Sequence, residues 1–213
     1  MHKTAARSVV EVRIIEASVQ LFAQRGFKGT STRQIAHLAD VSEATLFRHF
    51  PRKTRLFWEA AESTLRRVKL GRALQMSLAN DVEPAQVIPL IVRFLVQTIA
   101  QEPQLLRLLW VAANELRGSD RMLREHLGPI FDSVNAYFSR CAARGVVCNL
   151  DPSMVTLSMA AAIGTHRSLH QFFADKTSPW KAKEMAREHS QLWLNVVRQQ
   201  LPEQHVGAIS LPG

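Results

Sequence analysis

Two side chains that could read a base edge lie within one short stretch of the chain, VSEATLFRHF, at residues 41–50. Arg48 could donate two hydrogen bonds to a guanine, and Thr45 could contact a base edge or a thymine methyl group. The apolar residues Leu46 and Phe50 recur at the spacing of one helix face. The stretch therefore predicts a short helix that packs by one face and exposes a polar, partly cationic face.

A second short helix precedes this one, and only a few residues join the two. Ser31 is a suitable N-cap for a helix over residues 32–39, and Ser42 is a suitable N-cap for a helix over residues 43–49. Two short helices with a tight connection describe a helix-turn-helix, which sets its second helix in the major groove of DNA. In isolation, Arg48 could equally be an ordinary exposed polar residue.

Positive charge is concentrated in the first third of the 213-residue chain, whose net charge is +9. Residues 1–72 hold 14 Lys and Arg against 6 Asp and Glu, whereas residues 73–213 hold 13 against 12. A nucleic-acid partner, an anionic membrane surface or a solvated basic surface would each explain this asymmetry. No apolar run approaches the roughly 18 residues of a membrane span, and the N-terminus lacks the apolar segment of a secretory signal. We therefore expect a cytoplasmic protein with no membrane partner.

Apolar residues recur at helical spacing along nearly the whole chain, and convincing alternating strands are absent, which predicts an all-α fold. The pattern predicts a first helix over residues 9–25 that ends at Gly26, and a fourth helix over residues 53–75. Further helices are predicted over residues 85–101, 103–116, 121–144, 152–174 and 181–200. We expect an N-terminal helix-turn-helix domain over residues 1–54 and a larger helical domain over residues 55–213.

The run from Arg13 to Ala60 resembles the DNA-binding domain of the TetR family of bacterial transcriptional regulators. Three motifs carry the resemblance, in order and without gaps: LFAQRGF, TSTRQIA and VSEATLFRHFPRKTRLF. The resemblance implies an N-terminal domain that binds an operator as a dimer, and a C-terminal domain that dimerises and holds an inducer. Phe47 stands where the family usually has Tyr, which removes a hydrogen bond to phosphate. Asp40 stands where Gly is usual in the turn, and Asp accepts a positive φ at some cost.

The resemblance implies DNA contacts from three helices. Thr32 and Arg33 would contact phosphate from the start of the second helix, and Lys53 would bind a phosphate at the start of the fourth helix, where the helix end itself favours an anion. The residues in or beside the groove would be Ser42, Glu43, Ala44, Thr45, Phe47, Arg48 and His49. We expect double-stranded operator DNA with a palindromic sequence as the partner, and repression as the outcome.

Large apolar side chains are frequent between about residues 94 and 138. They predict helical core, and the resemblance adds a ligand cavity lined by some of them, which suits an apolar small molecule. The candidate ligand-binding residues are Phe94, Leu109, Trp110, Asn114, Phe131, Phe138 and His166, with Glu115 as a further polar candidate. We expect the ligand to bind against the fourth helix near Trp110 and to release DNA by favouring a wrongly spaced state of the two recognition helices.

The last two long helices predict a homodimer interface. Small residues in the run MAAAIGTHRSL, at residues 159–169, would let a partner helix approach closely, and the final helix has more apolar surface than one outer helix needs. Pairing both helices with a second copy would form a four-helix interface with two-fold symmetry, and contact within the chain is the alternative. The candidate interface residues are Ala161, Gly164, Leu192, Trp193, Val196 and Val197.

Chemistry other than binding has weak support in the sequence. His166 and His170 could share a helix face as metal ligands, but no third ligand lies nearby, so neither a metal site nor a cofactor is predicted. Cys141 and Cys148 could form a redox switch, although buried and unreactive thiols are commoner. No Gly-rich phosphate loop, nucleophile motif or pair of carboxylates stands out, so an enzyme is the weaker alternative.

Overall fold

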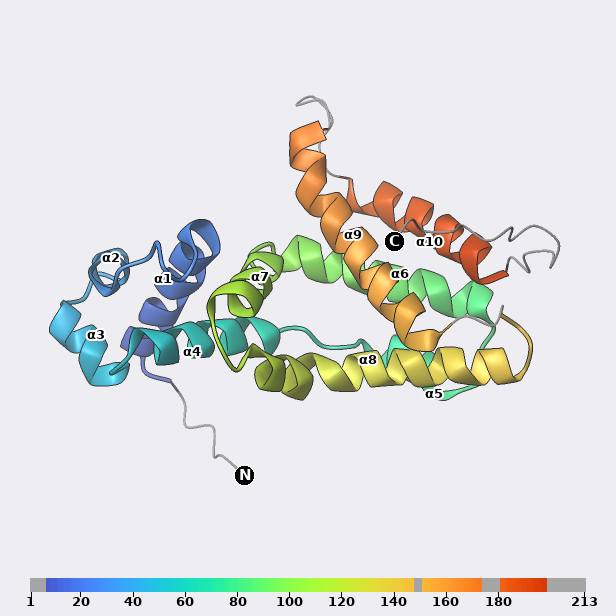
Figure 1. The fold of residues 1–213 in the computed structure, drawn as a ribbon, viewed down its shortest axis with the longest axis horizontal. Helices are drawn as coiled ribbons and strands as arrows, with labels where there is room; N and C mark the ends of the chain where they lie inside the picture. The colour runs from blue at the N-terminus through green and yellow to red at the C-terminus, as the bar shows by residue number, and fades with distance from the viewer. Residues whose placement is uncertain (1–6, 148–150, 174–180, 199–213) are drawn as a thin grey trace, which may run out of the picture.

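The structure is a computed structural model that describes residues 7–147, 151–173 and 181–198. Its helices are α1 (Val9–Arg25), α2 (Thr32–Leu38), α3 (Glu43–His49), α4 (Lys53–Leu65), α5 (Arg72–Ala79), α6 (Pro84–Gln101), α7 (Leu105–Glu115), α8 (Ser119–Ala143), α9 (Pro152–Phe173) and α10 (Ala182–Arg198). The described residues contain no strand, so the prediction of an all-α fold is confirmed. Helices α1–α3 lie at one end of an elongated molecule, and α5, α6 and α8–α10 lie at the other (Figure 1).

Side-chain caps define where the first three helices begin. Ser8 accepts a hydrogen bond from the backbone N–H of Glu11 at 3.2 Å, and the Glu11 carboxylate accepts one from the Ser8 N–H at 2.9 Å. Ser31 and Gln34 form the same reciprocal capping box at the start of α2. Ser42 caps α3 through a single backbone N–H. The predicted starts of α2 and α3 are therefore confirmed.

The fourth helix is shorter than the sequence predicts. α4 ends at Leu65 and a separate helix, α5, begins at Arg72, so the prediction of one helix over residues 53–75 is wrong. The intervening segment keeps an apolar pattern and contains no proline, which is why the sequence alone does not reveal the break. Gly71, the N-cap of α5, is the only local signal for a stop.

Tertiary contacts account for the break between α4 and α5. Val68 and Leu70 lie two residues apart, but Val68 packs against one hydrophobic cluster and Leu70 against the other. Arg67 is held by Glu102 at the end of α6, with 2.6 Å between Nε and Oε1. These contacts hold the irregular segment 66–71 between the two clusters.

Two clusters of buried apolar residues divide the molecule. The first joins α1–α4 with α7 and the beginning of α8, and the second joins α5, α6, α9 and α10 with the rest of α8. Aromatic rings form the centre of the first cluster, where the ring centroids of Phe22 and Phe57 are 5.1 Å apart and those of Phe27 and Phe57 are 5.8 Å apart. The boundary after residue 54 stays a prediction, because α4 shares its buried contacts with α1–α3.

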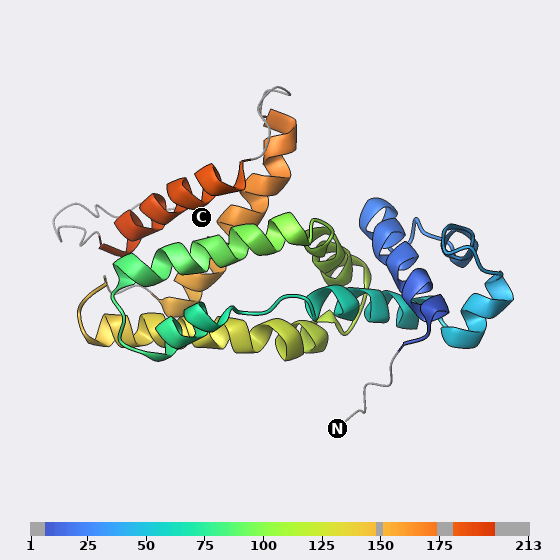
Figure 2. The same ribbon diagram turned by 180° about the vertical axis from the view of Figure 1, so that it is seen from behind.

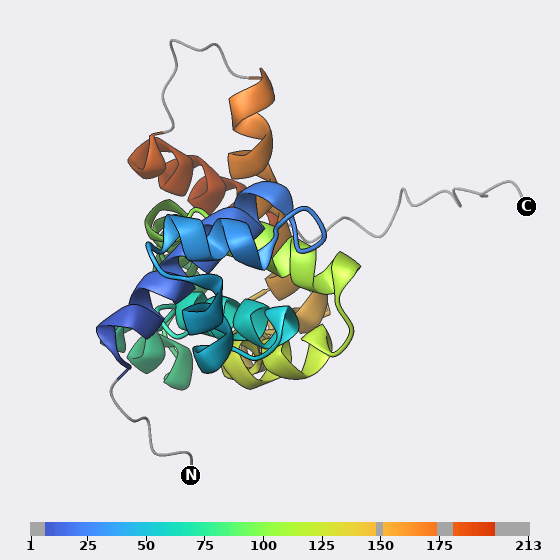
Figure 3. The same ribbon diagram turned by 90° about the vertical axis from the view of Figure 1, so that its left-hand side faces the viewer.

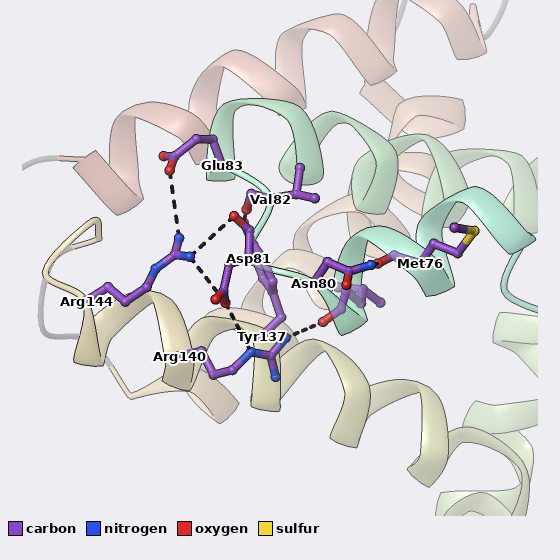
Figure 4. Close-up of polar contacts among 9 residues, drawn as sticks. Met76, Asn80, Asp81, Val82, Glu83, Tyr137, Arg140 and Arg144 are labelled. Atoms are coloured by element: carbon purple, nitrogen blue, oxygen red, sulfur yellow. Dashed lines mark hydrogen bonds and ion pairs between the residues drawn. The ribbon is translucent and has the colours of Figure 1, made fainter.

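Two arginines of α8 hold the connection between α5 and α6 (Figure 4). Nitrogen atoms of Arg144 and Arg140 lie 3.2 Å and 3.8 Å from the Asp81 carboxylate. Tyr137 donates a hydrogen bond to the Val82 carbonyl at 2.8 Å, and burial raises the pKa of its hydroxyl. The C-terminal end of α5 is therefore fixed to α8, whereas its N-terminal end follows the irregular segment after α4.

The final helix lies along α6, as the views from the front and from behind agree (Figures 1 and 2). Its buried residues Met185, Trp193 and Val197 belong to the second cluster. Helix α9 packs against α6 and α8 and closes the same cluster. None of the helices in the described part of the chain is long and apolar enough to cross a membrane.

Candidate DNA interface and ligand cavity

Helix α3 presents one face to the solvent and anchors the other in the core. Leu46 is fully buried and Phe50 is 5% exposed, and both belong to the first cluster. On the other side, Ala44, Phe47 and Arg48 are exposed. Figure 3 views the molecule from the end that carries α1–α3. The arrangement leaves a short, partly cationic helix face available to a partner at this end of the molecule.

The turn between α2 and α3 depends on a residue in the left-handed region. Asp40 has φ of 52°, in agreement with the expectation that this position requires a positive φ. Arg13 of α1 supports the turn, since its Nε donates to the Ala39 carbonyl at 2.9 Å and its Nη2 donates to the carbonyls of Ala39 and Asp40. The sequence indicates the strain at Asp40, but the role of Arg13 appears only in the fold.

The predicted phosphate contact at the start of α2 is already engaged within the protein. Thr32 donates from Oγ1 to Oε1 of Glu43 at 2.5 Å, which joins the first turn of α2 to the first turn of α3. Ser42 donates from Oγ to Oγ1 of Thr45 at 2.9 Å. Arg33 is exposed. The Thr32 hydroxyl must therefore leave Glu43 before it can donate to a phosphate, whereas Arg33 can reach one directly.

His49 faces the first helix rather than a groove. Its Nδ1 lies 3.3 Å from Oε1 of Glu11, and the side chain is 22% exposed. The backbone N–H of Ser8 and, to a smaller extent, His49 lower the pKa of the Glu11 carboxyl. The predicted contact of His49 with DNA stays a prediction, and in this structure the residue lies at the end of α3 where the helix meets α1.

Lys53 is also partly withdrawn from the surface. Its Nζ lies 4.4 Å from the centroid of the Phe27 ring, and burial lowers its pKa while the charge of Glu115 opposes that change. Arg52 and Arg55, on either side of it, are exposed. They are cationic groups near the start of α4 that were not among the predicted DNA contacts, although both lie within two residues of Lys53 in the sequence.

Glu115, at the end of α7, joins the ligand-bearing part of the fold to the loop after α1. Its carboxylate accepts a hydrogen bond from the backbone N–H of Lys28 at 2.9 Å. Gly26, in the same loop, allows this approach, because a Cβ there would lie 2.6 Å from Glu115 Oε1. The same carboxylate acts on the charge of Lys53. Glu115 is thus a joint between the cavity-lining helix α7 and the loop after α1, whereas the sequence suggested it only as a ligand contact.

An apolar cavity of about 130 Å³ lies among α6, α7, α8 and α9. Three of the predicted ligand-binding residues, Phe94, Leu109 and Phe131, line it. The only polar groups in its wall are the hydroxyls of Thr98 and Thr156. Residues that the sequence analysis missed include Val68, Leu74, Ile91, Leu106, Ile130 and Met159. The binding of a ligand by these residues remains a prediction.

The other four predicted ligand-binding residues do not line this cavity. Trp110 is 72% exposed, because it follows Leu109 by one residue and therefore points about 100° away from it around α7. Asn114 is exposed and donates to the Trp110 carbonyl at 2.8 Å. Phe138 is buried in the second cluster outside the cavity wall, and His166 is exposed. The structure corrects the prediction for these four positions.

Residues 14–60 match the family described as bacterial regulatory proteins, tetR family. The matched segment contains the buried anchors of α3, the turn at Asp40 and most of α4. Residues 14–60 are therefore a DNA-binding domain of the TetR family. Regulators of this family are DNA-binding transcription factors and not enzymes.

Sequence similarity to two bacterial proteins supports the assignment to the TetR family. The chain is 49% identical over 41 residues to the uncharacterized HTH-type transcriptional regulator YvkB of Bacillus subtilis, which is 19% of this chain and 22% of that protein. It is 29% identical over 157 residues to the probable acrEF/envCD operon repressor of Escherichia coli strain K12, which is 70% of each protein. The chain therefore aligns with about a fifth of the first relative's length and with about two thirds of the second.

Solved structures share the fold over most of the chain. A regulatory protein of the tetR family from Rhodococcus RHA1 superposes with a TM-score of 0.72 and 17% identity, over 90% of this chain and 98% of that one. The structure of AibR in complex with isovaleryl coenzyme A and operator DNA superposes with a TM-score of 0.68 and 16% identity, over 86% of this chain and 97% of that one. At these identities the likeness establishes the fold.

Several residues predicted for the dimer interface are buried within the chain itself. Trp193 is 8% exposed and Val197 is 1% exposed, because α10 turns this face toward α6. Gly164 is buried against α7, where an added Cβ would lie 3.4 Å from Leu106. The alternative of contact within the chain is therefore correct for these three residues. Ala161 and Leu192 are exposed, and Val196 is half-buried.

A pair of histidines connects α9 with α10. His166 Nδ1 lies 3.1 Å from His189 Nε2, and burial, followed by the proximity of His166, lowers the pKa of His189. Within the described residues, no group of three or more His, Cys, Asp or Glu side chains is arranged to hold a metal ion. The side chain of His170 and the whole of Cys148 lie outside the described residues, and Cys141 is a buried free thiol.

Proposed function

We propose that the chain is a homodimeric repressor that binds a palindromic operator and leaves it when an apolar small molecule fills the cavity. The observation that carries this proposal is the exposed face of α3, opposite the buried anchors Leu46 and Phe50. A recognition helix needs such an anchored, exposed face to enter a major groove. Arg48 is the residue that would read a guanine, and Arg33 and Arg52 would contact phosphate.

Two similar proteins support repression and control by a ligand. The E. coli relative is named as a probable operon repressor, and the AibR structure contains both an operator and an acyl coenzyme A. A cavity with almost no polar groups in its wall suits an apolar ligand in this chain too. The apolar lining of the cavity and the exposed α3 together favour a regulator whose DNA affinity a small molecule controls.

The exposed face of α9 supports a homodimer. Met154, Leu157 and Ala161 follow one another at intervals of three and four residues and are exposed, and Leu192 of α10 is 51% exposed. Met154 and Leu157 are 65% and 57% exposed, which is unusual for large apolar side chains on one helix face. A second copy of the chain would cover this face and place two recognition helices on half-sites about 34–36 Å apart.

The route for release runs through α7. Leu105, Leu106 and Leu109 of this helix line the cavity, and Glu115 at its end holds the backbone of Lys28. A ligand that displaces α7 would therefore displace the domain that carries α3. Release requires that the ligand bind the displaced state more tightly than the DNA-bound state, and linkage then requires DNA to weaken ligand binding by the same factor.

Selection of genomic DNA fragments by the purified full chain tests the proposed function. The expected result is enrichment of fragments that share a two-fold symmetric sequence, with half-sites one helical turn apart. Sedimentation at micromolar concentration provides the second measurement, and we expect a dimer. Enrichment of no common sequence would contradict operator binding, and a monomer that binds the selected palindrome at full affinity would contradict the dimer.

A further inference from the structure

The cavity is small, and its size limits what part of a ligand it can hold. Its volume of about 130 Å³ is close to the ~150 Å³ of an engineered cavity, lined by Leu, Ile and Phe, that binds benzene. The enclosed part of a cavity of this size holds an apolar group of roughly six carbons. A charged group would find only the hydroxyls of Thr98 and Thr156 there, and Thr156 already donates to the Pro152 carbonyl at 2.9 Å. A charge inside this cavity would therefore be buried without partners, which is costly.

A second hollow of about 270 Å³ adjoins the cavity and has a different chemistry. The two share Val68, Leu74, Phe94 and Thr98 in their walls. The other wall residues of this hollow, which we name the cationic groove, include Arg67, Lys69, Arg93, Gln97, Gln101 and Glu102. Three cations thus face a single carboxylate, across the segment after α4 and the exposed side of α6.

Two of the three cations in the cationic groove are available to a ligand. Arg67 is held by Glu102 at 2.6 Å. Within the part of the chain that the structure describes, Lys69 and Arg93 have no carboxylate partner, and both are exposed. The apolar cavity therefore opens beside a groove with uncompensated positive charge.

We propose that the effector is an anionic amphiphile, with an apolar group of about six carbons in the cavity and an anionic head in the cationic groove against Lys69 and Arg93. The inference rests on the proposed function, because it names the ligand class of the same cavity. The anion can belong to a carboxylate or to a phosphate-bearing carrier that is joined to the apolar group. Both sources share the chemistry that the groove recognises, a negative charge within reach of a guanidinium and an ammonium group.

Titration calorimetry with the full chain can test both halves of the ligand. The probes are straight-chain carboxylates of two to ten carbons, their neutral amides, the corresponding coenzyme A thioesters, and coenzyme A alone. We expect affinity to rise about fourfold for each added methylene, because each is transferred from water to an apolar wall, and to stop rising near six carbons. We expect hexanoate or hexanoyl coenzyme A to bind at least tenfold more tightly than hexanamide, and added salt to reduce that preference.

Matched variants assign the charge preference to the groove. Lys69→Gln and Arg93→Gln should reduce the preference for the anion over hexanamide, whereas Lys183→Gln on α10 should leave it unchanged.

If the carboxylate binds and the thioester does not, the head is a carboxylate. The reverse result identifies a phosphate-bearing carrier, and either result supports the proposal. Hexanamide that binds as tightly as both anions would overturn it while leaving the cavity as the effector site. Coenzyme A that binds as tightly as its thioester would overturn it because the cavity would then contribute nothing. If no probe binds, charged or neutral, the inference fails together with the ligand-binding part of the proposed function, and the DNA selection still tests the rest.

Discussion

The joint between α7 and the loop after α1 is most sharply tested by replacing Gly26 with alanine. Gly26 has φ of 73° and ψ of 176°, a conformation that is essentially restricted to glycine. An alanine Cβ would also lie 2.6 Å from Oε1 of Glu115. The carboxylate would therefore have to move away from the backbone N–H of Lys28, from which it accepts a hydrogen bond at 2.9 Å. The substitution therefore adds strain and removes a contact between α7 and the loop after α1.

The two costs of Gly26→Ala can be estimated separately. The backbone conformation should cost about 1–3 kcal/mol for any residue with a Cβ. Loss of a hydrogen bond to a charged acceptor costs ~1 kcal/mol here, at the low end of its range because Lys28 is exposed. We therefore expect the free energy of unfolding to fall by about 2–4 kcal/mol. Gly118→Ala is the matched control, since Gly118 has φ of 85° but nothing within 4 Å of the added Cβ, and it should cost about 1 kcal/mol.

Urea denaturation of four proteins separates strain from the loss of the joint. The proteins are the wild type, Gly26→Ala, Glu115→Ala and the double variant. Their free energies of unfolding can be compared when their m-values are equal. In the Glu115→Ala background the collision is absent, so Gly26→Ala should cost ~1 kcal/mol less there than in the wild type. If Gly26→Ala has the same cost in both backgrounds, the two residues are not coupled. The assignment of Glu115 as the joint would then be wrong.

Four further substitutions test the remaining parts of the proposal. Arg48→Ala should lower operator affinity by about 1–3 kcal/mol and relax the preference for one base pair in each half-site, and an equal loss on random DNA would instead assign Arg48 to the backbone. Leu157→Arg should raise the dissociation constant of the dimer in sedimentation experiments, because it places a charge on an apolar interface; an unchanged constant would exclude this face of α9. Phe131→Trp should fill the cavity and reduce release by the effector while operator affinity without effector stays within about twofold, and loss of both would indicate misfolding instead. His189 has a pKa below its ordinary 6.5 in the folded protein, so the unfolded chain binds a proton first as the pH falls, and stability should decline below about pH 6.5; His189→Leu should flatten this decline in urea midpoints measured at pH 7.5 and 5.5.

Local features of the fold could be predicted because their causes lie within a few residues. Ser31 and Ser42 define helix starts through bonds to backbone groups three positions away, and Leu46 and Phe50 define the buried face of α3 by spacing alone. The positive φ of Asp40 agrees with the resemblance to the TetR family, in which Gly is usual at this position. Such features require no knowledge of what packs against them.

Features that depend on the choice of helix face could not be predicted in the same way. Trp110 and Leu109 are adjacent and both apolar, and only the position of α8 and α9 decides which of them lines the cavity. Trp193 and Val197 look equally suited to a partner chain or to α6, and the fold assigns them to α6. Apolar character specifies burial but not the neighbour, which is why the sequence predicts a cavity and an interface more reliably than it predicts their members.

The break after α4 changes how a ligand can act on the DNA-binding end. All buried apolar residues of α4 belong to the first cluster, so this helix should move with α1–α3 as one body. No residue of α4 lines the cavity, whereas Val68, three residues after its end, does. A ligand therefore cannot lever a single rigid helix over residues 53–75. It must act through the short segment that contains Val68 and through α7, whose last residue, Glu115, holds the loop after α1. A ligand that shifts these two contacts would shift α3 with the rest of the first cluster, and in the proposed dimer that motion would change the spacing of the two recognition helices.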